Sequence, residues 1–197
     1  MQTNFEFDLG YKRQGYNLIA GADEAGRGPI AGPIVAAAVI MPLGEQIEGI
    51  TDSKKLTEQT REVLYNAIIS KAVCYEVCVL SAAHIDKVGI QNANITVLQR
   101  AILGLSVKPD IVLVDYLKLG DLGLKSESIT KGDTKSYNIA CASIIAKVTR
   151  DRIMQELDKI HPQYLLAKHK GYGTLKHREL VKQFGMLADL HRKTFKM

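Results

Sequence analysis

The sequence lacks the features of membrane proteins and of disulfide-stabilised proteins. Its longest unbroken apolar run, from Ile34 to Met41, is far shorter than the ~20 residues that cross a bilayer. The amino terminus has neither the basic nor the apolar region of a signal peptide. The three cysteines form no CxxC pair, and their odd number argues against a disulfide framework. We therefore expect a cytoplasmic protein with no membrane segment, in which Cys74 and Cys78 fill the core.

Several catalytic motifs are also absent. Residues 21–26 fit the opening of a phosphate-binding P-loop, but Arg27 and Gly28 stand where Lys and Ser or Thr are required. Residues 26–31 fit the dinucleotide-binding pattern by letter, yet a strand-like run bounded by prolines follows where a helix is needed. No G-x-S-x-G elbow occurs, and none of the five histidines lies at zinc-ligand spacing from another. These absences argue against nucleotide-binding loops, serine hydrolase triads and zinc sites.

The length and composition fit one globular domain. The chain has 197 residues, of which 46% are hydrophobic, and it contains no internal repeat, low-complexity tract or linker. We expect residues 1–197 to form a single domain, with residues from about 160 to 197 as a small helical carboxyl-terminal appendage. No feature argues for an obligate oligomer, so we expect a monomer. The formal net charge of +5 favours a polyanionic partner such as a nucleic acid.

The hydrophobic pattern predicts strands that alternate with helices. Apolar or alternating runs predict strands at 18–24, 34–41, 73–80, 110–115 and 126–130. Helical apolar spacing predicts one helix that begins near Thr57 and further helices at 82–88, 91–105, 135–160 and 175–184. Residues 1–17 have no clear period, which indicates a surface segment. The first two strands, joined by a short glycine loop, are expected to pair antiparallel within an α/β fold.

Four carboxylates stand at the ends of predicted elements. Asp23 and Glu24 are adjacent at the end of the first strand, and Asp115 ends a continuous apolar run. Asp133 precedes the long helix. Adjacent acids disfavour joint ionisation unless a cation neutralises them, and three or four carboxylates suit one or two Mg²⁺ ions. Taken singly, each acid could instead serve a turn, and Asp133 could be a helix N-cap.

A Gly-Arg-Gly turn directly follows the acidic pair. Gly26 and Gly28 leave the backbone N–H groups bare, and Arg27 between them supplies a guanidinium. Such groups suit phosphate oxygens and sugar hydroxyls. A metal site beside such a turn indicates phosphodiester chemistry, although Arg27 taken alone could be only a salt-bridge partner.

The motifs along the chain resemble, in order, those of bacterial ribonuclease HII. They run from residue 19 to residue 195 and comprise GADEAGRGPIAGPIVAAAVI, TDSKKL, LVDY, KGD followed by ASIIAKVTRD, PQY, HKGYGT and HRKTF. The resemblance implies a ribonuclease H-like fold with a mixed five-stranded sheet flanked by helices. It also implies a metal-dependent endonuclease that cuts RNA in RNA–DNA duplexes. The family is further known for cutting 5′ of a single ribonucleotide embedded in duplex DNA, and we expect 3′-hydroxyl and 5′-phosphate ends.

The resemblance assigns roles to individual residues. The family's catalytic metal ligands, for two Mg²⁺ or Mn²⁺ ions with substrate bound, match Asp23, Glu24, Asp115 and Asp133. Gly26, Arg27 and Gly28 match the motif that contacts the 2′-hydroxyl of the ribonucleotide. Tyr172 matches the tyrosine that packs on the following deoxyribose, although without the motif it would be taken for an ordinary core or surface aromatic. Candidates for phosphate contact are Lys54, Lys55, Lys147, Lys168 and Lys170, of which Lys54 is assigned to substrate binding. Taken alone, each of these lysines could instead be solvated surface.

Some positions depart from the family pattern, and other functions stay open. Tyr116 stands where the family usually has glycine, and larger residues at 137, 138 and 141 precede or interrupt the small-residue helix motif. A nuclease or recombinase of the wider ribonuclease H-like group would share the carboxylates but lack the ribose-reading residues. A catalytically inactive duplex-binding module is disfavoured because all four acids are present. The sequence also leaves open whether a sliding clamp binds the protein.

Overall fold

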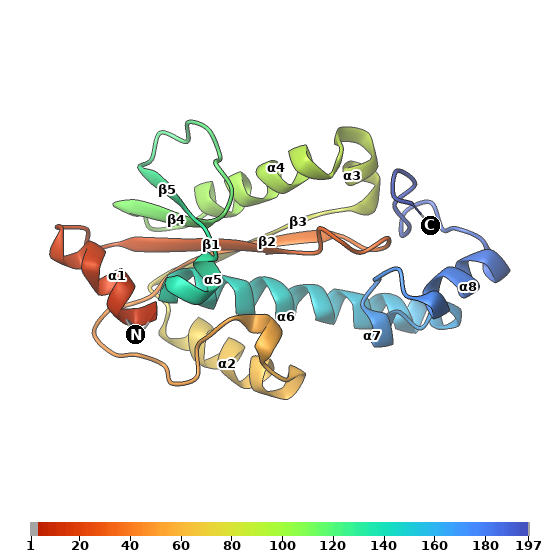
Figure 1. Cartoon of the computed structure of the whole chain (residues 1–197), viewed down its shortest axis with the longest axis horizontal. Helices are drawn as coiled ribbons and strands as arrows, with labels where there is room; N and C mark the ends of the chain where they lie inside the picture. The colour runs from red at the N-terminus through yellow and green to blue at the C-terminus, as the bar shows by residue number, and fades with distance from the viewer. Residues whose placement is uncertain (1–3, 197) are drawn as a thin grey trace.

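The computed structural model describes residues 4–196 and contains a five-stranded sheet flanked by helices (Figure 1). The strands are β1 (Ile19–Ala25), β2 (Ile34–Ile40), β3 (Cys74–Leu80), β4 (Ile111–Asp115) and β5 (Ser126–Ile129), in the spatial order β3-β2-β1-β4-β5. The helices are α1 (Asn4–Arg13), α2 (Glu58–Lys71), α3 (Ala82–Val88), α4 (Ile90–Leu103), α5 (Gly132–Lys135), α6 (Tyr137–Ile160), α7 (Leu166–His169) and α8 (Leu175–Phe184), with 3₁₀ turns at Ser53–Lys55 and Pro162–Tyr164. The predicted α/β fold and its five strands are confirmed.

The pairing of the strands makes the sheet mixed. β1 pairs antiparallel with β2, as the short glycine loop predicts, and β2 pairs antiparallel with β3. β1 also pairs parallel with β4, which in turn pairs parallel with β5. The carboxyl ends of β1, β4 and β5 therefore meet at one edge of the sheet, where open α/β sheets commonly carry their functional groups.

Helices cover both faces of this sheet (Figure 1). One face packs against α6, α2 and α1, and the other packs against α3 and α4. α6 lies so close to β1 that a Cβ on Gly21 would stand 2.1 Å from the carbonyl carbon of Asn138. Glycine at this position lets the two backbones approach, and the approach fixes the position of α6 against the end of β1.

The amino-terminal segment is a helix, which corrects the prediction of an irregular surface segment at 1–17; residues 1–3 lie outside the described residues. Its apolar residues recur at every second position from Phe5 to Tyr11, so the sequence has no helical period. The buried carboxylate of Asp8 accepts hydrogen bonds from the backbone N–H and the side chain of Asn138, each at 2.8 Å. Asn138 lies in the first turn of α6, so the carboxylate also meets the positive end of that helix. Tertiary contact therefore fixes α1.

The helix predicted at 135–160 is interrupted at Ser136. The backbone of Ser136 is extended, and its side chain caps α6 by accepting a hydrogen bond from the first turn. Tyr137 and Asn138, two of the larger residues noted in the sequence, both accept hydrogen bonds from backbone N–H groups in the segment after β2. They tie the start of α6 to the sheet.

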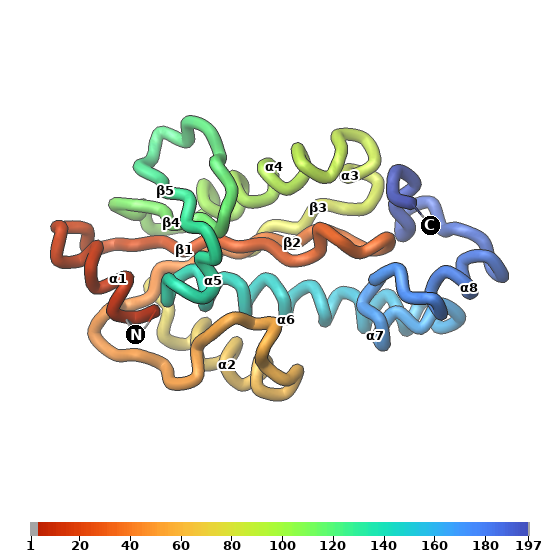
Figure 2. Tube along the Cα trace, viewed as in Figure 1, coloured from red at the N-terminus to blue at the C-terminus, as the bar shows by residue number. Residues whose placement is uncertain are grey.

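The chain after α6 forms a small helical part that returns to the sheet (Figure 2). Its 3₁₀ turn, α7 and α8 surround an apolar cluster that includes Tyr164, Leu166 and Leu180. The last segment then passes back to the loop between β1 and β2, where the N–H of Arg192 donates to the carbonyl of Ile30 at 2.9 Å. Residues from opposite ends of the sequence therefore meet in one place.

All three cysteines are free thiols; Cys74 and Cys141 are buried, whereas Cys78 is only partly buried. The prediction that Cys74 fills the core is therefore confirmed, and Cys78 lies at the edge of the core. Within residues 4–196 we find no helix with the length and apolar character needed to cross a membrane.

Candidate active site

Two of the four predicted acids lie side by side at the carboxyl ends of β1 and β4. The parallel register pairs the residues immediately before Asp23 and Asp115, so these two acids are the next pair along the strands. Neighbouring strands lie roughly 4.8 Å apart, and residues in register point to the same face of the sheet. That face is the one covered by α6, because Gly21, two residues before Asp23, contacts α6.

Glu24 points to the opposite face, since successive side chains of a strand alternate. Its Oε1 accepts a hydrogen bond from the amide of Asn94 in α4 at 3.1 Å and lies 3.9 Å from a guanidinium nitrogen of Arg27. Asn94 is fully buried, and its Oδ1 has no protein hydrogen-bond partner among the described residues. Asn94 was not among the predicted site residues, although an asparagine on the apolar stripe of α4 was an available signal.

Asp133 reaches the same edge of the sheet from α5. Its side chain is almost fully buried, and Oδ2 lies 3.4 Å from Lys54 Nζ. Neither α5 nor α6 uses Asp133 as its N-cap, so that alternative is wrong. The N–H of Gly132 donates to Oδ1 of Asp115 at 2.6 Å, which ties α5 to the end of β4 and brings the two acids together.

The carboxylates repel one another in poorly hydrated surroundings. Burial, followed by the charges of Glu24 and Asp115, raises the pKa of Asp23 well above its ordinary value. Burial likewise raises the pKa of Glu24 and that of Asp115, the latter with a contribution from the Asp133 charge. Burial alone would lower the pKa of Lys54, but the charges of Asp133 and Asp23 outweigh it and raise that pKa. The nearby cations therefore do not supply enough positive charge to neutralise the acids.

This set of donors fits a divalent metal ion. Carboxylate oxygens are hard ligands, and Mg²⁺ typically takes one or two of them together with water and substrate phosphate oxygens. Within residues 4–196, no three carboxylate, imidazole or thiol groups converge closely enough to enclose an ion by themselves. Asp23 and Asp115, flanked by Glu24 and Asp133, would hold the ions, and a cation there would favour the ionised forms of these acids.

The Gly-Arg-Gly turn follows β1 directly and is supported by two buried arginines. Gly26 has a φ of +106°, and a Cβ at this position would stand 2.4 Å from Nε of Arg150. Arg192 donates to the carbonyl of Gly26 at 2.7 Å and to that of Arg27 at 3.2 Å. Among the described residues, no backbone partner accepts from the N–H of Arg27 or Gly28. The N–H groups of Arg27 and Gly28 are therefore donors that the turn can offer to a ligand.

Tyr172 lies next to this turn. A Cβ on Gly28 would stand 3.7 Å from Cε1 of Tyr172, and the tyrosine is 46% exposed. Its backbone is fixed on both sides, because its N–H donates to the carbonyl of His169 at 2.9 Å and its carbonyl accepts from Nδ1 of His177 at 2.9 Å. A well-anchored loop therefore presents the ring at the surface.

A cleft of about 350 Å³ brings most of the predicted residues together. Three of the acids, the Gly-Arg-Gly turn, Lys54 and Tyr172 line it. Asp133 lines an adjoining cleft of about 460 Å³, which shares Lys54, Asp115 and Tyr116 with the first. The fold thus places most of the predicted site residues around two adjoining clefts.

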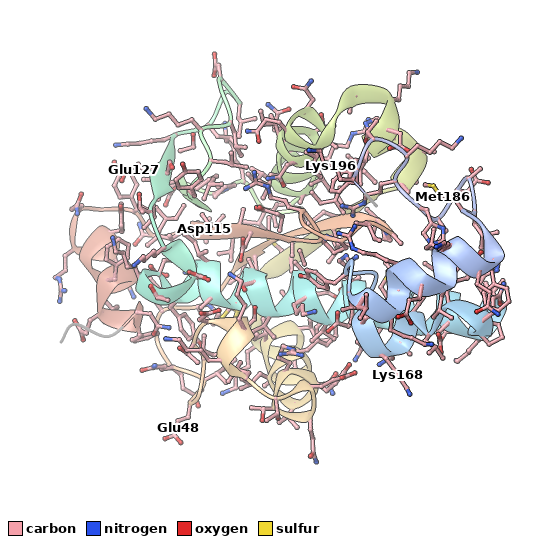
Figure 3. The ribbon with its side chains drawn as sticks, turned by 45° about the vertical axis from the view of Figure 1, so that its right-hand side comes forward. Glu48, Asp115, Glu127, Lys168, Met186 and Lys196 are labelled. Carbon is pink, nitrogen blue, oxygen red and sulfur yellow. The ribbon has the colours of Figure 1, made fainter. Side chains whose placement is uncertain are left out.

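The first cleft also contains side chains that were not predicted from the sequence. Ser143 and Arg150 project from α6 and line the cleft. Both lie within a helix motif, and the motif alone does not indicate which of its residues face the site. Lys147, one of the candidate lysines, lines the cleft as well, with Nζ 2.6 Å from a carboxylate oxygen of Asp151. The remaining candidates line neither cleft: Lys55, Lys168 and Lys170. Figure 3 shows Lys168 on the carboxyl-terminal helical part, well away from Asp115.

Both sequence and structure are similar to those of known ribonucleases. The family model described as Ribonuclease HII matches residues 20–197. The chain belongs to the ribonuclease HII family. Ribonuclease HII of Acetivibrio thermocellus is 51% identical over 183 residues, which cover 93% of this chain and 71% of that protein. Ribonuclease H2 from Pyrococcus horikoshii OT3 has a TM-score of 0.77 at 30% identity, and the match covers 91% of this chain and 94% of that chain. Ribonuclease HII in the PCNA:RNase HII complex from Archaeoglobus fulgidus has a TM-score of 0.77 at 28% identity, and the match covers 91% of this chain and 96% of that chain.

Membership of the ribonuclease HII family identifies the chain as an endonuclease of the ribonuclease H type, and this family is metal-dependent. The resemblance stated from the motifs and the ribonuclease H-like fold are both confirmed. The alternatives of a wider-group recombinase and of an inactive duplex-binding module are set aside, because the family match spans all four acids.

Tyr116 stands where the family usually has glycine, and its backbone adopts a turn that glycine would form without strain. Its φ is +58°, in the left-handed region. Its N–H donates to the carbonyl of Ile129 at 3.1 Å, and the next N–H, of Leu117, donates to the carbonyl of Asp115 at 2.6 Å. The carboxylate of Asp115 therefore stays at the strand end despite the larger residue.

Proposed function

We propose that this chain hydrolyses RNA in RNA–DNA duplexes and also cuts 5′ of a single ribonucleotide embedded in duplex DNA. The observation that carries the proposal is the presence of three of the acids, the Gly-Arg-Gly turn and Tyr172 in one cleft, with Asp133 in the cleft that adjoins it. Acids alone would fit many metal-dependent nucleases. The turn and the tyrosine add groups that suit a ribose beside the scissile phosphate. The products would carry 3′-hydroxyl and 5′-phosphate ends.

The four acids are proposed to hold Mg²⁺ or Mn²⁺, two ions when the substrate is present. When bound, such ions activate water and stabilise the charge that develops on the leaving oxygen. The contribution of the chain is to fix the ligands. The parallel ladder fixes Asp23 and Asp115, while a hydrogen bond from α4 restrains Glu24 and the ion pair with Lys54 restrains Asp133.

The Gly-Arg-Gly turn is proposed to recognise the 2′-hydroxyl, the group that distinguishes RNA from DNA. Because Arg192 occupies the carbonyls of Gly26 and Arg27, the donors left free are the N–H groups of Arg27 and Gly28. They suit the 2′-hydroxyl oxygen or an adjacent phosphate oxygen, and glycine lets the ribose approach the backbone closely. The exposed cations of Arg27 and Lys54 would contact phosphates and position the duplex.

Tyr172 is proposed to pack on the deoxyribose that follows the ribonucleotide. Its ring lies next to Gly28, the last residue of the turn. A flat ring against a sugar offers no partner to a 2′-hydroxyl and therefore favours the sugar that lacks it. Together, the turn and the ring would select a junction at which a ribonucleotide is followed by DNA.

A cleavage assay tests the proposed activity. An end-labelled DNA duplex with one ribonucleotide is incubated with Mg²⁺, with Mn²⁺ and with a chelator, beside an all-DNA duplex of the same sequence. We expect a metal-dependent cut on the 5′ side of the ribonucleotide alone, with an upstream end that a DNA polymerase extends. Equal cutting of the all-DNA duplex, or no cutting with either metal, would contradict the proposal.

A second assay tests the role of Tyr172 separately. Tyr172→Ala is expected to lose activity on the single-ribonucleotide duplex more than on an all-RNA strand paired with DNA, and Tyr172→Phe is expected to keep the wild-type preference. Equal cleavage of the two substrates by Tyr172→Ala would remove the tyrosine from the proposal and leave the turn as the ribose reader.

We further propose that the chain acts as a monomer in the cytoplasm, as one catalytic domain of residues 1–197 with a helical appendage from about residue 160. Free cysteines fit a reducing compartment. The contact of Arg192 with the turn argues that the appendage serves the same site. A sliding clamp is a candidate partner, because the Archaeoglobus fulgidus relative was solved in a complex with PCNA. Light scattering coupled to size-exclusion chromatography, with and without a clamp, tests the assembly.

A further inference from the structure

Tyr116 is large, exposed and held in a strained backbone conformation. A non-glycine residue in the left-handed region, here at a φ of +58°, costs roughly 1–2 kcal/mol. The residue is 66% exposed, so burial of the ring offsets little of that cost. The turn after Asp115 requires this backbone conformation but makes no use of the ring. Strain of this kind is concentrated at functional sites, which directs attention to what the ring contacts.

The ring lies where the two clefts of the site meet. The Gly-Arg-Gly turn and Tyr172 line only the first cleft, and Lys131 and Thr134 line only the second. The residues that the two clefts share are Lys54, Asp115 and Tyr116. Asp115 and Tyr116 therefore separate a ribose-reading side of the site from a second side, where the proposed function uses Asp133 but assigns no contact with a sugar.

The second cleft has the chemistry of a surface for a nucleic-acid backbone. Its cations, hydroxyls and aromatic ring come from Lys54, Lys131, Thr130, Thr134 and Tyr116. The carboxylates of Asp52, Asp115 and Asp133 also line it. Asp52 accepts the N–H of Lys54 at 2.9 Å, and Asp115 and Asp133 belong to the proposed metal site. Cations and hydroxyls suit phosphates and fix the register of a strand, while a flat ring suits a sugar.

We propose that Tyr116 contacts the substrate and packs on the sugar of the nucleotide immediately 5′ of the cut. This inference rests on the proposed function, in which the ribonucleotide lies 3′ of the cut and is read by the Gly-Arg-Gly turn. The strand on the other side of the scissile phosphate then passes over Asp115 into the second cleft, and Tyr116 is the aromatic side chain that it meets. Tyr116 and Tyr172 therefore flank the ribonucleotide, each against a neighbouring deoxyribose.

Steady-state cleavage of two duplexes tests the inference. Both contain one ribonucleotide in DNA and differ only in the nucleotide 5′ of it, which carries deoxyribose in one and 2′-O-methylribose in the other. We expect wild-type protein to have the lower KM on the deoxyribose duplex. Tyr116→Gly is expected to raise that KM about tenfold, with kcat changed less than twofold, and to lose discrimination between the duplexes. Tyr116→Phe, which keeps the ring, is expected to restore the wild-type KM.

Two matched variants give the comparison its controls. Tyr75→Ala removes an exposed tyrosine from β3, outside both clefts, and is expected to leave KM unchanged. Tyr172→Ala is expected to keep the discrimination at the upstream sugar. A wild-type KM for Tyr116→Gly, an equal rise on both duplexes with discrimination retained, or a Tyr116→Phe variant as impaired as Tyr116→Gly would overturn the inference. Failure of the wild-type protein to cut either duplex would instead contradict the proposed function.

Discussion

The acidic edge of the sheet and the basic cluster of Arg150 and Arg192 both bury like charges, but the two regions balance them differently. At the acidic edge, burial and then neighbouring acids raise the pKa of Asp23 and that of Asp115. In the basic cluster, the two arginines are 1% and 0% exposed and donate to backbone carbonyls. Burial, followed by the charge of Arg150, lowers the pKa of Arg192 to about 9.

This difference separates a site that needs a ligand from a support that is already complete. The fixed fork of donors on a guanidinium can be satisfied by several carbonyls, and those carbonyls belong to the loops that present the Gly-Arg-Gly turn and Tyr172. Ionised carboxylates only accept hydrogen bonds, so their mutual repulsion is relieved by protons or by cations. Metal binding is therefore expected to act on the first region and mutation of the arginines on the second.

The largest effect is expected at the acidic edge. Asp115→Asn keeps an acceptor for the N–H of Gly132 but removes a charge, so we expect kcat with saturating Mg²⁺ to fall by about 10³-fold. The melting temperature of the metal-free protein is expected to stay constant or rise, because the repulsion falls. Asp121→Asn, in the exposed loop after β4, is the control and should change neither quantity. A lower melting temperature for Asp115→Asn would contradict the contrast between the two regions.

The next effect is expected in the basic cluster. Arg192→Met keeps an apolar stem but leaves the carbonyls of Gly26 and Arg27 without their donor, so we expect the free energy of unfolding in urea to fall by about 3 kcal/mol. Arg152→Met is the control, because Arg152 pairs with Glu62 at the surface and should cost less than about 1 kcal/mol. Equal losses for the two variants would mean that burial adds nothing to the role of Arg192.

A smaller effect is expected from pH at the histidines behind Tyr172. His177 donates through Nδ1 to the carbonyl of Tyr172, and its Nε2 lies 3.3 Å from Nε2 of His191. Burial lowers the pKa of His177 to about 4, and the charges of His169, His191 and Arg178 act in the same direction. The unfolded chain therefore binds more protons between this pKa and the ordinary value near 6.5. The free energy of unfolding should fall by about 2 kcal/mol as pH drops from about 6.5 to about 5, within that window.

Urea titrations at pH 7, 6 and 5 measure this dependence. His177→Gln should reduce the slope of stability against pH, whereas His84→Gln, on α3 and away from the cluster, should keep it. A slope that is unchanged in His177→Gln would assign the pH dependence to other groups and would show that the support behind Tyr172 does not require neutral His177.

The smallest effect is expected from backbone strain beside the acids. Tyr116→Gly removes a side chain from a position with a φ of +58°, so we expect the free energy of unfolding to rise by about 1 kcal/mol. Gly123→Ala is the mirror experiment, because Gly123 has a φ of +64° and nothing within 4 Å of an added Cβ. That variant should lose a similar amount. A less stable Tyr116→Gly variant would mean that the ring packs on the protein and would remove strain from the account of the acidic edge.

Local pattern was sufficient for the sheet and for the acids. Each strand carries its own apolar or alternating run, β4 ends in an acid and β1 carries two acids just before its last residue, so their positions follow from short stretches of sequence. The same pattern failed for α1, whose apolar residues alternate and whose buried Asp8 is stabilised by a partner 130 residues away. It also failed at Ser136, where a single extended residue divides the predicted helix.

The sequence by itself determined which side chains carry the chemistry, because carboxylates, a Gly-Arg-Gly turn and a tyrosine are recognisable by type and order. The tertiary structure alone decided how they meet. Parallel pairing sets Asp23 beside Asp115, and strand alternation turns Glu24 to the other face towards Asn94. Arg192 reaches Gly26 across 166 positions of the chain. Such contacts depend on which elements pack together, and no local pattern of residues encodes that packing.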